Sequence, residues 1–178
     1  MSDTRTVGTV YGIPPQPHVP EHTTSFPAGA VTFGVEYRDL DPESLRATYA
    51  GNAAQLAELE ERSPEGGFTD RGVTIHVWDA ADGHLYVRFD CFDDEPHYHY
   101  NHRVGPDGEV VNNVVDFDPV AHGPMLPWAI DALRTRLPEM LEHAGAPDVA
   151  ARLDPAVVGP AIDEVAARAT HVAGFSAR

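Results

Sequence analysis

The chain has 178 residues, of which 42% are hydrophobic, and this length predicts one domain with a sizeable core. Acidic residues number 28 against 12 basic ones, and the net charge of -16 disfavours nucleic acid and anionic membranes as partners, because both bind basic surfaces. All 12 basic residues are Arg, which excludes Schiff-base and other lysine chemistry.

Residues 1–30 are rich in proline and poor in large apolar side chains. Proline lacks a backbone donor and favours extended structure, so we predict an extended arm over residues 1–30 and a single α+β domain over residues 31–178. Such an arm can cover a pocket or a neighbouring subunit, although poorly ordered termini are commoner. The chain has one cysteine, no stretch that resembles a signal peptide and no apolar run of membrane-spanning length, which favours a cytoplasmic protein.

The domain is predicted to begin with a strand over residues 31–37. Asp41 and Pro42 form a helix start, because Asp caps a first turn and proline suits the first helical position. Apolar residues at spacings of three and four continue one stripe as far as Leu59, and Pro64 ends it. One helix is therefore expected after the first strand.

Two alternating runs, residues 73–78 and 84–92, are separated by a turn that contains Asp-Gly, and they predict a β-hairpin. One face of this hairpin is apolar, and the other carries Trp78, Tyr86 and Phe92. We expect that second face to be covered, because a large exposed aromatic patch is uncommon on a soluble monomer.

A further strand is predicted over residues 109–117. In the C-terminal third, an apolar stripe over residues 126–144 predicts a helix with a kink at Pro138, followed by shorter helices near residues 147–153 and 160–172. The predicted fold is α+β, with an antiparallel sheet of four to five strands, one helix inserted after the first strand and C-terminal helices on one face. The alternative is a small β-barrel with a helical extension.

The segment Glu95-Pro96-His97-Tyr98-His99-Tyr100-Asn101-His102 is the most site-like part of the chain. In a strand, His97 and His99 share one face while Tyr98 and Tyr100 share the other. Two imidazoles one residue apart on a strand form half of many transition-metal sites, and Fe, Zn or Cu would suit them. Candidates for the remaining ligands are Glu95, His102 and His122, with Asp93, His76 and Asp116 as further possibilities.

A metal-free site is the alternative for the same segment. His97 or His99 would then act as general acid or base, oriented by Glu95 or Asp94. Tyr98 and Tyr100 would donate hydrogen bonds to a carbonyl or phenolic substrate, and they complete the candidate catalytic set. The candidate substrate-binding residues are Arg88, Trp78 and Tyr86.

Two functional hypotheses follow. The first is a small cytoplasmic enzyme that acts on a neutral or aromatic small molecule through the His-x-His segment, as an oxygenase, lyase or hydrolase that spacing does not distinguish. The second is a non-catalytic acidic accessory subunit or interaction module, which uses the proline-rich arm and the aromatic face to form a homo-oligomer or to bind a larger enzyme.

Overall fold

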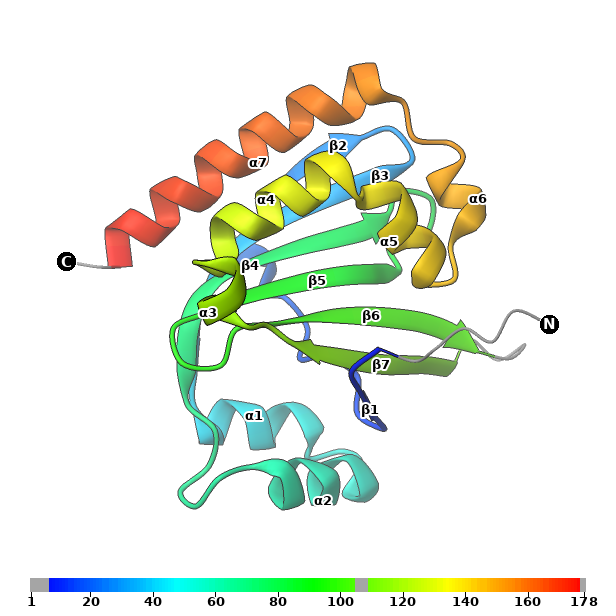
Figure 1. Ribbon diagram of the computed structural model, residues 1–178. Helices are drawn as coiled ribbons and strands as arrows, with labels where there is room; N and C mark the ends of the chain where they lie inside the picture. The colour runs from blue at the N-terminus through cyan, green and yellow to red at the C-terminus, as the bar shows by residue number, and fades with distance from the viewer. Residues whose placement is uncertain (1–6, 105–108, 177–178) are drawn as a thin grey trace.

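The computed structural model describes residues 7–104 and 109–176, and it is built on a 7-stranded antiparallel sheet (Figure 1). The strands lie in the order β1-β7-β6-β5-β4-β3-β2, so most neighbours in the sheet are also neighbours in sequence. Their bounds are Thr9–Tyr11 (β1), Thr24–Ala28 (β2), Val31–Leu40 (β3), Asp70–Asp79 (β4), Leu85–Phe92 (β5), His97–Val104 (β6) and Glu109–Asp116 (β7).

Helices lie on both sides of this sheet. Their bounds are Pro42–Tyr49 (α1), Ala53–Arg62 (α2), Pro119–His122 (α3), Met125–Thr135 (α4), Leu137–His143 (α5), Pro147–Ala150 (α6) and Pro155–Ser176 (α7), with a 3-10 turn at Pro20–His22. Helices α4, α5 and α7 pack on one face, where α7 contacts β2, β3 and β4 and the other two contact β5. Helices α1 and α2 lie on the opposite side of the sheet (Figure 1). None of the helices in the described residues has the length and apolar run that a bilayer requires.

The hydrophobic core lies between the sheet and the C-terminal helices. Alternate residues of β3, β4 and β5 point toward the helices because side chains in a strand face opposite sides by turns. Phe33, Ile75 and Phe89 from these strands are fully buried, and they belong to the same apolar cluster as Leu141 and Val165 from the helices. This face is an ordinary apolar core, and it leaves the other face of the sheet for polar residues.

The second face of the sheet is polar and nevertheless buried. The residues that share this property are Glu36, Arg38, Thr74, His76, Arg88, Asp90, His99, Asn101 and Asn112. They are covered by residues 13–18, which we call the strap, together with α1, whose Tyr49 hydroxyl donates to the carbonyl of Pro14 at 2.8 Å. Because buried polar groups are costly unless they are paired, this face is where a functional site is expected.

The α+β class, the antiparallel sheet and the C-terminal helices on one face are confirmed. The prediction of four to five strands is wrong, because the N-terminal segment adds β1, which pairs with β7, and β2, which pairs with β3. These are the two edge strands of an open sheet, so the alternative of a closed barrel is also wrong. Residues 9–11 and 24–28 therefore belong to the sheet and not to a separate arm.

Two predicted helices are divided in the structure. The helix expected after the first strand is two helices, because α1 ends at Tyr49 and the side chain of Asn52 caps a new start by accepting from the backbone of Ala54 and Gln55. The helix with the predicted kink at Pro138 ends at Thr135, and Pro138 lies in the first turn of α5, where its missing donor costs nothing. The three aromatic rings expected to be covered are covered, since Tyr86 and Phe92 are buried and Trp78 is partly buried. They do not share one face as predicted, because Tyr86 packs in the apolar core.

Candidate functional site

The hairpin of β5 and β6 brings the candidate residues together. In its register, Asp90 lies opposite His97 and Arg88 lies opposite His99. The turn between the strands is held by Asp70 at the start of β4, whose carboxylate accepts from the backbone N–H groups of residues 93, 94 and 95 at 3.2, 3.2 and 2.8 Å. Because of this pairing, the side chains of Arg88, Asp90, His97 and His99 all point to the buried polar face.

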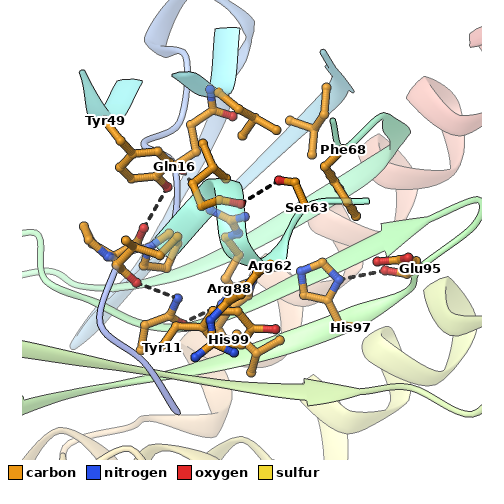
Figure 2. A pocket seen from close by; sticks show the side chains of 18 of the residues that line it. Tyr11, Gln16, Tyr49, Arg62, Ser63, Phe68, Arg88, Glu95, His97 and His99 are labelled. Carbon is orange, nitrogen blue, oxygen red and sulfur yellow. Dashed lines mark hydrogen bonds between the residues drawn. The ribbon is translucent and has the colours of Figure 1, made fainter. Parts of the chain in front are cut away.

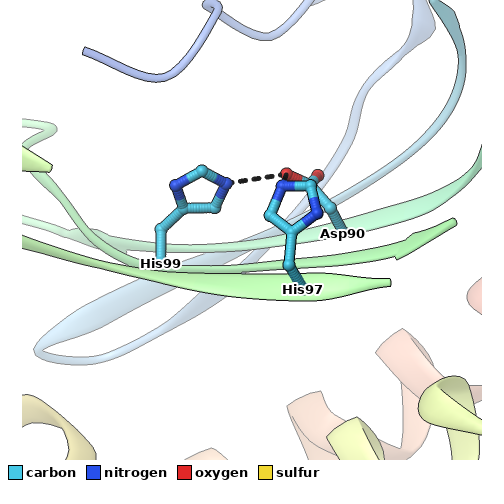
Figure 3. Close-up of side chains that lie close together, drawn as sticks. All are labelled: Asp90, His97 and His99. Carbon is cyan, nitrogen blue, oxygen red and sulfur yellow. Dashed lines mark hydrogen bonds and ion pairs between the residues drawn. The ribbon is translucent and has the colours of Figure 1, made fainter. Parts of the chain in front are cut away.

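Asp90, His97 and His99 form a compact cluster (Figure 3). The Nε2 atoms of His97 and His99 lie 3.3 Å and 3.0 Å from the same Oδ2 atom of Asp90. One ligand atom from each of the three residues lies within 4.8 Å of the other two. Asp90 is completely buried, whereas the side chain of His97 is 16% exposed, so the carboxylate lies deepest and His97 faces outward.

The outer nitrogen of each imidazole has an acceptor as its partner. His97 Nδ1 lies 2.7 Å from the backbone carbonyl oxygen of Glu95, and His99 Nδ1 lies 2.7 Å from Oδ1 of Asn112. The amide of Asn112 is oriented by its Nδ2 atom, which donates to the carbonyl of Ile13 at 3.0 Å. Because these oxygens can only accept, each Nδ1 carries the hydrogen, and in a neutral imidazole the Nε2 lone pair faces Asp90.

Arg88 and Thr74 hold the carboxylate of Asp90. Arg88 donates through Nε and Nη2 to Oδ2 at 2.8 and 2.6 Å, and the Thr74 hydroxyl donates to Oδ1 at 2.6 Å. Burial alone would raise the pKa of Asp90, but the charge of Arg88 and the contact with His97 hold that pKa well below its usual value. The cluster therefore contains a fully buried carboxylate anion.

The two histidines differ in their electrostatic surroundings. Burial and the positive charge of Arg88 lower the pKa of His99 to about 4, so His99 is neutral near pH 7. Burial also acts to lower the pKa of His97, but its hydrogen bond to Asp90 and the charge of that carboxylate raise the pKa above its usual value.

A pocket of about 190 Å³ lies over the cluster (Figure 2). His97, His99 and Arg88 line it from the sheet, and the strap, α1 and α2 line it from the other side. Its aromatic lining residues are Tyr11, Tyr49, Phe68 and Phe92, and its acidic ones are Glu95 and Asp116. This volume suits a small molecule of one or two rings, since a cavity of about 150 Å³ accommodates benzene.

The strap is tied to the polar face by two arginines. The backbone carbonyl of Gln16 accepts from Arg38 at 3.2 Å and from Arg88 at 2.8 Å. Arg38 also pairs with Glu36, whose Oε1 lies 3.0 Å from Nε2 of His76. The carboxylates of Glu36 and Asp90 are thus both compensated by an arginine that also binds the strap.

The predicted candidates divide between the two faces. His97, His99, Arg88 and Glu95 line the pocket together. Tyr98 and Tyr100, predicted as catalytic, lie on the helix face, where their ring centroids are 5.4 Å from Trp128 and 4.5 Å from His143.

The other candidate ligands do not reach the cluster. His102 lies on the helix face with its ring 5.9 Å from that of His143, and His122 lies in α3 beside Phe117. Glu95 is in the turn, where its backbone carbonyl binds His97. Of the further possibilities, Asp93 pairs with Arg71, His76 pairs with Glu36 and Asp116 lines the pocket.

Trp78 and Tyr86, predicted to bind substrate, lie outside the pocket. Trp78 stacks on His76 with ring centroids 4.7 Å apart. Tyr86 packs in the apolar core, because an irregular register after Val77 changes which side of β5 faces the helices.

Asp90, Asn112 and Gln16 are the important residues that sequence analysis missed. Asp90 lies in the alternating run of residues 84–92, and counting outward from a turn of residues 93–96 would place it opposite His99, on the face that both histidines share, whereas the actual register pairs it with His97. Asn112 and Gln16 carry no comparable signal, because their roles arise from contacts between segments that are distant in sequence.

A family model described as Domain of unknown function (DUF7700) matches residues 25–169. The chain belongs to this family. The DUF7700 match contains Asp90, His97 and His99, while the strap precedes it. Neither a curated protein nor a solved structure matches the chain. The DUF7700 description carries no activity, so function has to come from the chemistry of the site.

The role of Asp70 in holding the turn leads to a first prediction. Asp70→Ala should lower the free energy of unfolding by about 2–4 kcal/mol, because the backbone N–H groups of residues 94 and 95 lose their charged acceptor, while that of Asp93 keeps the carbonyl of Arg71. Urea denaturation followed by circular dichroism measures this loss. Asp94→Ala, which changes an exposed carboxylate in the same turn, should stay within about 0.5 kcal/mol of the wild type. Equal stability of the two variants would contradict this role.

A second prediction concerns the dependence of stability on pH. Burial is the main cause that lowers the pKa of His76 to about 4, although its hydrogen bond to Glu36 opposes this shift. In the unfolded chain, His76 binds its proton below about pH 6.5, so its contribution to stability is lost as the pH falls from 6.5 toward 4. His76→Gln cannot take up this proton. Between pH 7 and pH 4, its free energy of unfolding should therefore fall by up to about 3 kcal/mol less than that of the wild type. Urea denaturation across that pH range measures how the free energy of unfolding of each protein changes with pH. The same change in both proteins would refute the prediction.

Proposed function

We propose that this protein is a metal-dependent enzyme in which Asp90, His97 and His99 bind one divalent transition-metal ion and a neutral or aromatic small molecule occupies the pocket above it. The observation that carries the proposal is the convergence of two Nε2 atoms on one carboxylate oxygen while both Nδ1 atoms face acceptors. Histidines that bind metals are oriented in this way, with the other ring N–H donated to a carbonyl or carboxylate.

The cluster needs a cation or an additional proton. With Nδ1 of His99 protonated, a neutral ring directs a lone pair at a carboxylate oxygen only 3.0 Å away, and the two acceptors repel each other. A second proton on His99 is disfavoured by complete burial and by the nearby charge of Arg88. A metal ion bound by all three groups would remove the repulsion by accepting the Nε2 lone pairs of both histidines, and the Asp90 carboxylate would offset part of the positive charge that it adds beside Arg88.

The spacing of the donor atoms suits a transition metal. Bonds of about 2.0–2.1 Å in a tetrahedral arrangement separate neighbouring ligand atoms by about 3.4 Å, close to the 3.0 and 3.3 Å found between the imidazoles and Asp90. Two histidines and one carboxylate leave coordination positions open, which is typical of catalytic sites and of iron enzymes that use oxygen. A bound metal would supply Lewis-acid catalysis or activate a water molecule there.

The pocket supports an uncharged or aromatic substrate. His97 and His99 line it, so open coordination positions would face its interior. The aromatic rings of Tyr11, Tyr49 and Phe92 offer flat apolar walls. Arg62 and Arg88 also line the pocket, but they pair with Glu58 and Asp90, so Glu95, Asp116 and the net charge of -16 would disfavour anionic molecules.

A metal-free acid/base enzyme is the second candidate for the same pocket. It is favoured by the contact between His97 and Asp90, because a histidine that is bonded to a buried carboxylate and partly exposed to a pocket can transfer a proton to a bound molecule. Both candidates use His97, and they differ in whether the cluster binds a metal.

Metal content distinguishes the candidates and gives a third prediction. Protein purified without a histidine tag should contain close to one equivalent of Fe, Zn, Cu, Mn or Ni by elemental analysis, or take up one equivalent of Zn²⁺ in calorimetry after treatment with a chelator. His97→Ala and His99→Ala should each lower affinity for the metal at least about 100-fold, because each removes one of three ligands. His102→Ala is the matched control, since it removes an imidazole from the same strand on the opposite face and should keep the metal.

A wild-type protein that neither carries nor takes up metal would contradict the metal proposal, as would retention of full metal content by His97→Ala and His99→Ala. The acid/base candidate then requires that both variants fold, as judged by circular dichroism, and lose turnover or binding of a small molecule while His102→Ala keeps it.

A further inference from the structure

A second cavity, of about 220 Å³, lies on the polar face of the sheet beside the first pocket. Pro14, Pro15 and Gln16 of the strap line both cavities, so the strap is a wall shared between them. The second cavity is otherwise lined by Pro17, His18, His76, Trp78, His84, Leu85, Asn101 and Val110. Asp90, His97 and His99, the three proposed metal ligands, are not among these residues.

Two side chains that line this cavity have buried polar atoms without a partner. Asn101 is 1% exposed, and neither Oδ1 nor Nδ2 of its amide makes a hydrogen bond within the described part of the chain. His76 is also 1% exposed, and its Nδ1 atom is likewise unpaired. Leaving such groups unpaired costs free energy, so they indicate that something else supplies their hydrogen bonds.

The hydrogen-bonding roles of these atoms are defined by their neighbours. Nε2 of His76 lies 3.0 Å from the carboxylate of Glu36, so Nε2 carries the ring hydrogen and Nδ1 is an acceptor. The amide of Asn101 offers an acceptor and donors side by side. A complementary molecule therefore has an adjacent donor and acceptor, together with a further N–H or O–H group.

The walls of the cavity are flat and uncharged. Trp78 stacks on His76 at an interplanar angle of 7°, and the ring of His18 lies 4.8 Å from Trp78. Three prolines of the strap also line the cavity. No acidic residue and no arginine lines this cavity among the described residues, so no unpaired charge is available to bind an ion.

We infer that this cavity is a second binding site, separate from the candidate metal centre, for an uncharged aromatic amide or nitrogen heterocycle of one or two rings. The donor–acceptor edge of the ligand pairs with the amide of Asn101, an N–H group of the ligand pairs with Nδ1 of His76, and its ring packs against the strap prolines beside Trp78. The volume agrees with this class, because about 150 Å³ holds a benzene ring.

Tryptophan fluorescence gives a direct test. The chain has 2 tryptophans, and Trp128 lies on the helix face beside Phe117 and Tyr98, so Trp128→Phe leaves Trp78 as the only reporter. This variant would be titrated with benzamide and with uracil, both uncharged planar molecules with an amide edge. 1,3-Dimethyluracil is the control ligand, because it keeps the ring and lacks both N–H donors.

We expect a saturable change in fluorescence with benzamide or uracil, with a dissociation constant of about 1 mM or less, and binding of 1,3-dimethyluracil that is at least about tenfold weaker. Asn101→Leu in the same background should weaken binding by at least about tenfold. Asn113→Leu, which replaces another buried asparagine that does not line the cavity, should bind as tightly as its parent. His99→Ala, which removes a proposed metal ligand, should bind benzamide or uracil as tightly as its parent. Binding in the second cavity therefore does not depend on whether the first site holds a metal.

His18→Ala provides a variant that does not depend on replacing a buried residue, since His18 is partly exposed in the strap. It should fold like its parent and bind benzamide or uracil more weakly. The absence of a saturable change with either molecule would show that only ordered water fills the cavity, and it would overturn the inference. Equal binding of uracil and 1,3-dimethyluracil, or full binding by both Asn101→Leu and His18→Ala, would overturn it as well.

Discussion

The polar half of this protein depends on one interaction, the burial of the Asp90 carboxylate against Arg88. Removing a carboxylate from water costs several kcal/mol unless nearby groups compensate it, and Asp90 is completely buried. The compensation comes from Thr74, Arg88 and His97 on the adjacent strands β4, β5 and β6, and His99 of β6 contacts the same carboxylate oxygen. The antiparallel register that places Asp90 opposite His97 is therefore also what assembles the candidate metal centre.

The proline-rich strap follows from the same requirement. Arg88 and Arg38 have donors left over after pairing with Asp90 and Glu36, and they need acceptors that bring no competing donors. The proline-rich strap supplies such acceptors, because both arginines bind the carbonyl of Gln16, whose neighbours Pro15 and Pro17 have no N–H group. The carbonyls of residues 13, 14, 16 and 17 all accept hydrogen bonds from side chains of the sheet or of α1. The strap thereby closes the polar face and divides it into two cavities.

Local patterns predicted the parts of the fold that depend on neighbouring residues. The hairpin of β4 and β5, the alternation of His97 with Tyr98 and the capped start of α1 could all be read from the sequence, because each is set by strand periodicity or capping within a few residues. The edge strands were missed because proline suggested an arm, whereas edge positions tolerate it. Asp90 was missed because its role needs the register across a turn, which local spacing does not give. The contacts of Gln16 and Asn112 join distant segments, which single-sequence patterns do not encode.

The central claim is that the three side chains surround a metal ion. A crystal of the protein loaded with Zn²⁺ or Co²⁺, with diffraction measured on both sides of the absorption edge of the metal, tests it most directly. The account predicts one strong anomalous peak about 2.0–2.2 Å from Nε2 of His97, Nε2 of His99 and a carboxylate oxygen of Asp90. A loaded crystal without a peak at this position, in which Nε2 of His99 still contacts Asp90 directly, would contradict it.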